Sequence, residues 1–335
     1  MTSRERVKTI FSGKPADRCG FWLGAPHGDT WPIYYQYFGT EDQESIRQSL
    51  GDDLRWITAD RAYKDPEGKP LFNHRWTGIS EGSVPVFAEC EDPREVDSIP
   101  WPNPDYLDFT EVVEALRNVG DFYRASGMWS CFFHIVADFF GMENYFVKMH
   151  TNPDVVDAVT ERVCEYYLEA NRRFFEAAGD EADAFFMGND YGTQLDLIIS
   201  PEHIDRFIMP YTRELVGLAR RYGRQVSHHC CGAVHKMIPR FIDAGVHAVH
   251  PLQALARDMD AETLARDFKG KVAFLGGIDT QQLLIHGTPE EVKADVRRVK
   301  KLLGPCLVVS PSHEAILPNV PPENVAAMAE AAREF

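Results

Sequence analysis

The segment QVSHHCCG, residues 225–232, is the stretch of the sequence that says most about the fold. It is short and partly apolar, it follows a predicted helix, and its glycine leads into another predicted helix. This pattern predicts a β-strand between two helices. Side chains two apart in a strand point to the same side, so His229 and Cys231 share one face, and His228 and Cys230 share the other.

Units of this kind repeat along the chain. We expect strands at residues 19–24, 54–58, 128–133, 184–187, 225–231, 247–250, 271–275 and 306–309. About eight strand–helix units in a chain of this length favour a closed (β/α)8 TIM barrel over an open doubly wound sheet. We therefore expect a single α/β domain over residues 1–335. It would consist of the barrel, an N-terminal extension, and a loop or hairpin excursion on the barrel face at residues 60–89.

Composition narrows the classes of partner. The formal net charge of −16 argues against nucleic acid and anionic membranes as partners. Seven irregularly spaced cysteines do not resemble a disulfide framework. The start MTSRERVK has no apolar signal region, and no apolar run approaches the ~18 residues of a membrane span. We expect a cytoplasmic protein with reduced cysteines, whose oligomeric state, a homodimer included, stays open.

Polar residues follow the C-terminal ends of the predicted strands, where (β/α)8 barrels carry their active sites. These residues are His27, His134, Asn189, Asp190, Tyr191, His229, Cys231, His250, Asp279, Ser312 and His313. Any one of them could be an ordinary turn or cap residue, and Asp279 could simply cap the helix that follows it. As a set they predict an active site at the C-terminal mouth of the barrel.

A His-x-Cys pair can supply two of the three protein ligands of a catalytic zinc ion. Cysteine is also among the most buried residue types, so such a pair can equally belong to the core. Strand spacing alone does not choose between the two faces of the strand. A third ligand would come from another strand end, with His313 the first candidate and Glu314 and Asp190 the alternatives.

Several ordered motifs resemble those of the zinc-dependent corrinoid methyltransferases of the uroporphyrinogen decarboxylase superfamily. HCCG at 229–232 resembles their His-x-Cys-Gly pattern. The further matches are GNDYGTQ at 188–194 followed by SPE at 200–202, HPLQ at 250–253, GGIDTQ at 276–281, and PSH at 311–313 leading to PPENV at 321–325. The resemblance covers nearly the whole chain. It implies a TIM barrel and assigns the metal to the face that carries His229 and Cys231.

Two features depart from the superfamily pattern. The decarboxylase itself has an arginine-rich N-terminal loop that holds tetrapyrrole carboxylates, whereas the corresponding loop here, GAPHGDTW at 24–31, has no arginine. Without guanidinium groups in that loop, tetrapyrrole decarboxylation is not expected. The methyltransferases often use cysteine where this chain has His313, and the decarboxylases carry a histidine there without a metal.

The resemblance implies an O-demethylase type of methyltransferase. A methyl group would pass between a small methylated compound and a cobalamin carried by a separate corrinoid protein, and Zn2+ on His229, Cys231 and His313 would act as a Lewis acid. The expected catalytic residues are Asp190, His27 and Tyr191, and the expected substrate contacts are Trp31, His134, Asn189, Gln194, His250 and Asp279. A methoxylated aromatic would suit the aromatic residues of the entrance, although these could equally be core: Trp22, Trp31, Tyr34, Tyr35, Phe132 and Phe133.

Three alternatives stay open. One is the other half-reaction, from a methylated corrinoid to a thiol or a pterin. Another is a metal-free decarboxylase of the same superfamily that uses Asp190 and His313. The last is a scaffold protein without catalysis. The expected barrel uses the whole chain, and we recognise no cobalamin-carrying domain in it.

Overall fold

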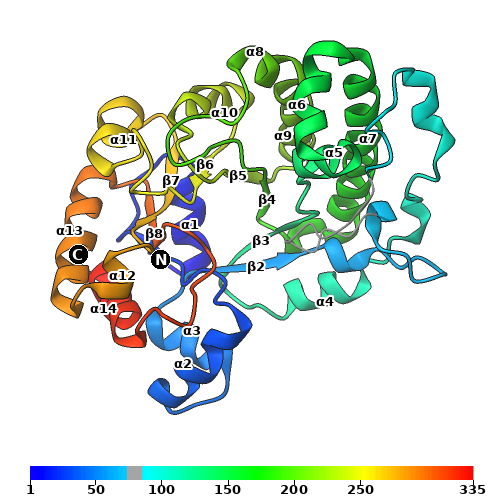
Figure 1. Cartoon of the computed structure of the whole chain (residues 1–335). Helices are drawn as coiled ribbons and strands as arrows, with labels where there is room; N and C mark the ends of the chain where they lie inside the picture. The colour runs from blue at the N-terminus through cyan, green and yellow to red at the C-terminus, as the bar shows by residue number, and fades with distance from the viewer. Residues whose placement is uncertain (74–84, 335) are drawn as a thin grey trace.

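The computed structural model describes residues 1–73 and 85–334. Its centre is a sheet of parallel strands curled into a barrel, with helices packed around the outside (Figure 1). The strands are β1 (Gly20–Phe21), β2 (Leu54–Thr58), β3 (Tyr123–Gly127), β4 (Ala184–Gly188), β5 (Gln225–His229), β6 (Ala248–His250), β7 (Ala273–Ile278) and β8 (Leu307–Pro311). Their order in the sheet is β1-β8-β7-β6-β5-β4-β3-β2. The predicted (β/α)8 TIM barrel is confirmed.

The barrel is nearly closed, and its wall is weakest between β1 and β2. These two strands stand at the two ends of the sheet order, and no strand pairing joins them in the described part of the chain. One backbone hydrogen bond crosses the seam, from Asp53 N to Phe21 O at 2.8 Å. Because β1 has only two residues, it offers little backbone for further pairing.

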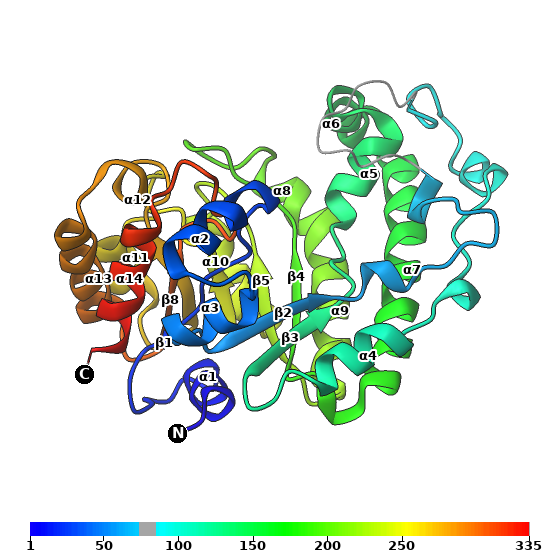
Figure 2. The ribbon, with the colours of Figure 1, turned by 90° about the horizontal axis from the view of Figure 1, so that it is seen from below.

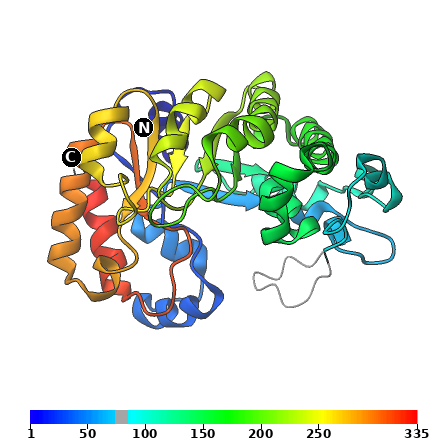
Figure 3. The same cartoon turned by 45° about the horizontal axis from the view of Figure 1, so that its top comes forward.

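Helices alternate with the strands and cover the barrel. They are α1 (Ser3–Phe11), α2 (Trp31–Phe38), α3 (Gln43–Leu50), α4 (Thr110–Arg117), α5 (Phe132–Phe140), α6 (Met142–Thr151), α7 (Pro153–Ala178), α8 (Pro201–His203), α9 (Met209–Arg221), α10 (Ile238–Ala244), α11 (Ala261–Phe268), α12 (Leu283–His286), α13 (Pro289–Leu303) and α14 (Pro322–Arg333). The green helices α5 to α7 lie together on one side of the barrel, next to the blue-to-cyan excursion (Figure 3). Across the described residues, no helix combines the length and the apolar character that a membrane span requires.

The inside of the barrel is filled with side chains, as in other barrels of this size. Helix α1 closes its N-terminal end and packs Val7, Ile10 and Phe11 against the inward side chains of the strands (Figure 2). Closer to the C-terminal end of the barrel, the ring centroid of Phe186 lies 5.9 Å from that of Trp22 and 5.2 Å from that of Trp56. These rings form an aromatic floor beneath the C-terminal mouth of the barrel.

One predicted strand is wrong. Residues 128–133 do not form a strand: β3 is Tyr123–Gly127, and Phe132 begins helix α5. Residues 128–131 form a loop that runs into the buried start of α5, and so short a mostly apolar run cannot be assigned to strand or helix by periodicity. The preceding helix α4 ends at Arg117, and the chain then turns into β3.

The excursion between β2 and α4 consists of short 3-10 turns among its described residues. They span Asp60–Ala62, Leu71–Asn73, Pro93–Ser98 and Pro104–Tyr106. A single antiparallel bridge joins Tyr63 and Leu107, at the two ends of the excursion. Part of the predicted loop or hairpin excursion at 60–89 lies outside the described residues, and residues 86–89 form a turn.

Candidate active site at the barrel mouth

The two histidines of strand β5 point to opposite faces of the barrel wall. The ring of His228 points outward and stacks on Phe241 of α10, with centroids 4.1 Å apart. Burial lowers the pKa of His228 to about 3, so this ring is neutral. His229 points inward against Trp129, at 5.4 Å between centroids. Its Nε2 lies 3.3 Å from Cys231 Sγ, so the inward face carries the candidate ligand pair.

Asp190 joins this pair from the loop after β4. Its Oδ1 lies 3.2 Å from His229 Nε2 and accepts a hydrogen bond of 2.8 Å from Cys231 N. Burial alone would raise the pKa of Asp190, but the hydrogen bond with His229 outweighs it and holds the pKa below its usual range. The loops after β4 and β5 approach this closely because both carry glycine: a Cβ on Gly232 would collide with the backbone of Gly192.

The other nitrogen of His229 faces a second polar pair. Its Nδ1 lies 2.9 Å from His250 Nδ1, at the end of β6, and 3.4 Å from Glu314 Oε2, just after β8. Burial holds the pKa of His250 well below its ordinary value, so this imidazole is neutral. Burial would also lower the pKa of His229, but Glu314, Asp190 and the Cys231 thiol together raise it well above the ordinary value.

Two groups of potential metal ligands therefore share His229 among the described residues. Asp190, His229 and Cys231 form one group, and His229, His250 and Glu314 form the other, with the ligand atoms of each group within 4.8 Å of one another. Thiolate, imidazole and carboxylate are the ligand types that zinc takes, so the first group fits a zinc ion by its chemistry. The buried Oε2 of Glu314 makes no hydrogen bond within the described chain.

His313, the predicted third ligand, lies beside Cys231 but outside both groups. A hydrogen bond with the Cys231 thiol raises the pKa of His313. Its Nδ1 accepts a 3.1 Å bond from Ala315 N, and its ring centroid is 6.3 Å from that of His229. The structure thus brings Asp190 closer than His313 to the His229 and Cys231 pair.

The two groups of potential ligands together form a polar cluster of Asp190, His229, Cys231, His250 and Glu314. Two of the predicted substrate contacts, His250 and His134, lie in it or next to it. His250 contacts His229 directly, and His134 accepts a 3.0 Å hydrogen bond from Asp190 N through its Nε2. His134 lies on helix α5 rather than at a strand end, as a consequence of the wrong strand at 128–133. Burial lowers the pKa of His134, which favours the neutral ring that accepts this bond.

The other predicted site residues lie elsewhere. Tyr191 is fully buried on the outer side of the barrel wall, near Phe133 and His228. The side chain of Asn189 bonds Phe133 N and Ser130 O. Asp279 accepts three backbone hydrogen bonds from residues 281–283, in the turn that leads into α12.

Three further candidates lie on the rim or in the helical layer. His27 is exposed on the rim, and Gln194 bonds Gln253 there. Trp31 is buried on α2 beside Tyr34 and Tyr35, which places these rings in the helical layer and not around the polar cluster.

Sequence reasoning missed two residues near the cluster. Trp129 covers His229, and Gly188 makes room for it, since a Cβ there would lie 2.7 Å from the indole. Asp60 accepts a 2.9 Å hydrogen bond from the backbone N–H of Trp129, and burial raises the pKa of the Asp60 carboxyl. Asp60 comes two residues after β2, so the strand-end rule could have found it, but it was assigned to the excursion.

Comparisons with known proteins identify the family. A sequence model of the family described as Uroporphyrinogen decarboxylase (URO-D) matches residues 77–335. The chain therefore belongs to the uroporphyrinogen decarboxylase family, as its motifs predicted. None of the proteins with curated descriptions matches the sequence.

A solved structure shares the fold of this chain. A methyltransferase from Methanosarcina mazei superposes with a TM-score of 0.71 at 16% identity, and the match covers 100% of this chain and 99% of that one. A 7,8-dihydropteroate synthase from Vibrio fischeri ES114 gives a TM-score of 0.36 at 9% identity, covering 95% of this chain and 91% of that one. At this identity the first match shows a shared fold.

Proposed function

We propose that this protein is a zinc-dependent methyltransferase that moves a methyl group from a small methylated compound to the cobalamin of a partner corrinoid protein. The observation that carries the proposal is the inward group of Cys231 Sγ, His229 Nε2 and Asp190 Oδ1 at the mouth of the barrel. The similarity in fold to a protein named a methyltransferase supports it.

His229, Cys231 and Asp190 would hold the metal, with His313 as the competing third ligand. A zinc ion bound there would supply Lewis acidity toward the oxygen that loses the methyl group. A site with three protein ligands leaves a position for that oxygen. The donor set fits zinc better than magnesium or calcium, which prefer oxygen ligands throughout.

The neighbouring residues would orient these ligands. Glu314 and His250 contact Nδ1 of His229 and so keep its Nε2 directed at Cys231. A ligating histidine usually donates its other N–H to such a partner, which fixes the tautomer. The N–H of Cys231 fixes Asp190, and His134 fixes the loop that carries it.

The substrate would sit over the exposed side of the ligand group, next to the indole of Trp129. His313 would give a proton to the leaving oxygen, a role supported by its partly exposed side chain beside Cys231. The methyl group would then pass to the cobalt of the partner's cobalamin, which requires the corrinoid protein to dock at the barrel mouth.

The test uses a reduced corrinoid protein, the zinc-loaded enzyme and a panel of methoxylated aromatics, followed by the absorption spectrum of the corrinoid. We expect substrate-dependent methylation with the wild type and with Cys230→Ala, whose thiol lies on the outer face, and none with Cys231→Ala. Methylation by Cys231→Ala at the wild-type rate would refute the site. Carbon dioxide release from a carboxylated substrate without zinc would instead identify a metal-free decarboxylase.

A further inference from the structure

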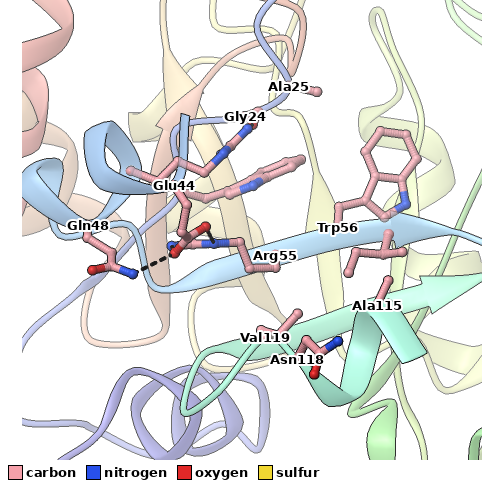
Figure 4. Close-up of a pocket in the computed structure, with 12 residues that line it drawn as sticks. Gly24, Ala25, Glu44, Gln48, Arg55, Trp56, Ala115, Asn118 and Val119 are labelled. Carbon is pink, nitrogen blue, oxygen red and sulfur yellow. Dashed lines mark hydrogen bonds and ion pairs between the residues drawn. The ribbon is translucent and has the colours of Figure 1, made fainter. Parts of the chain in front are cut away.

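The opening between β1 and β2 contains a cavity of about 330 Å³, which we call the seam cavity. Its lining combines two indoles that belong to the barrel interior, Trp22 and Trp56, with residues of α3 and α4 on the outside. Figure 4 shows β2 bordering the opening, with Trp56 rising from it and Gly24 and Ala25 crossing on the far side. No residue of the polar cluster at the mouth lines this cavity.

The buried guanidinium of Arg55 lines the seam cavity and binds the carboxylate of Glu44 there. Arg55 donates two parallel hydrogen bonds to Glu44, from Nε at 2.9 Å and from Nη2 at 2.7 Å. Gln48 supports the same carboxylate with a 3.0 Å bond (Figure 4). Paired bonds of this kind are the geometry in which arginine recognises carboxylates.

The two acids around Arg55 differ in exposure. Asp52 is fully buried, and it pairs with Arg47 at 2.7 Å and with Arg55 at 3.4 Å. Arg55 also donates to the carbonyl oxygens of Asp52 and Leu54. Glu44, by contrast, is 45% exposed. Arg55 would therefore stay in position if Glu44 turned into solvent, and its two outward N–H groups would be free.

We propose that the seam cavity binds a small carboxylate, whose carboxylate group replaces that of Glu44 on Arg55. The rest of the ligand would occupy the seam cavity beside Ala115 of α4. A cavity of this volume is in the range of small-molecule sites. This proposal stands whether or not the protein transfers methyl groups.

The probe is benzoate, with benzamide as its uncharged match, and the readout is isothermal titration calorimetry on the full-length protein. Glu44→Ala removes the internal competitor, so we expect it to bind benzoate at least about tenfold more tightly than the wild type. Benzamide should bind both proteins equally weakly. If Glu44→Ala fails to fold by circular dichroism, Glu44→Gln serves instead, because it keeps the bond to Gln48 without the negative charge.

A second variant tests the location. Ala115 lines the seam cavity on α4, and Ala115→Trp in the Glu44→Ala background should fill the space and abolish benzoate binding. Three results would each overturn the proposal: no benzoate binding by the folded Glu44→Ala protein, equal affinity for benzamide, or benzoate binding that persists in the Ala115→Trp double variant.

Discussion

Replacing Asp53 with asparagine should strongly destabilise the protein, because Asp53 holds the N-terminal end of the barrel together. Its fully buried carboxylate accepts hydrogen bonds from Arg6 at 2.7 Å, from Arg18 at 2.9 and 3.1 Å, from Ser3 at 2.7 Å and from Phe21 N at 2.9 Å. These partners come from α1, from the segment before β1 and from β1 itself. Asp53→Asn keeps the size of the side chain but removes its charge and turns one acceptor into a donor.

The expected loss of unfolding free energy depends on the arginine charges that stay buried after the substitution. Removing one partner of a buried ion pair costs about 3–5 kcal/mol of unfolding free energy, because the other charge stays buried and uncompensated. Arg6 keeps a second acid, Asp17, at 2.7 Å, and Arg18 keeps the carbonyl oxygen of Cys19. We therefore expect the lower end of that range, about 3 kcal/mol.

Equilibrium unfolding in urea, followed by circular dichroism, measures this change. The matched control is Asp29→Asn, whose side chain is 82% exposed and whose effect should stay within about 0.5 kcal/mol. A loss below about 1 kcal/mol for Asp53→Asn, or one equal to the control, would refute the reasoning.

Three further predictions concern the core, the site and the pH dependence. Phe186→Ala should cost about 3–5 kcal/mol in the same urea assay, because Phe186 is 1% exposed in the aromatic floor; a loss under about 1 kcal/mol would contradict that packing. Glu314→Gln should weaken zinc binding about 10- to 100-fold, because Glu314 contacts Nδ1 of His229 and orients the ring. A competition titration with a chromophoric chelator measures this affinity, and an unchanged affinity would contradict the orienting role of Glu314. Burial would raise the pKa of Asp183, but ion pairs with Arg4 and Lys8 hold it below the ordinary value. The stabilisation from these ion pairs is therefore complete above about pH 4 and is lost as the pH falls through the folded-state pKa, so Asp183→Asn should lose less stability on acidification than the wild type; parallel urea midpoints in the two proteins would contradict this.

The part of the site that the sequence predicted rests on one local rule. Alternation along β5 placed His229 with Cys231 and His228 with Cys230, and the structure shows these two pairs on opposite sides of the wall. The rule fails where the strand ends. β4 stops at Gly188, so spacing could not show that Asp190 turns toward the mouth while Tyr191 turns into the helical layer.

The misplaced residues share a physical cause. Residues 128–133 are a short, mostly apolar run made of a loop and the first two residues of α5, and periodicity cannot tell such a run from a buried strand. That ambiguity moved His134 to a strand end and hid Trp129 in a strand. The position of His250 against His229 depends on the register of β5 and β6, which pairs these two residues and which no local pattern specifies.

The most direct test of the account is the zinc content of the purified protein, measured by mass spectrometry after preparation without chelators. We predict about one zinc per chain in the wild type and in Cys230→Ala, and loss of the metal in His229→Ala and Cys231→Ala. Comparing Asp190→Ala with His313→Ala then identifies the third ligand by which variant loses more zinc. No zinc in the wild type, or equal zinc in Cys231→Ala and Cys230→Ala, would contradict the proposed metal centre.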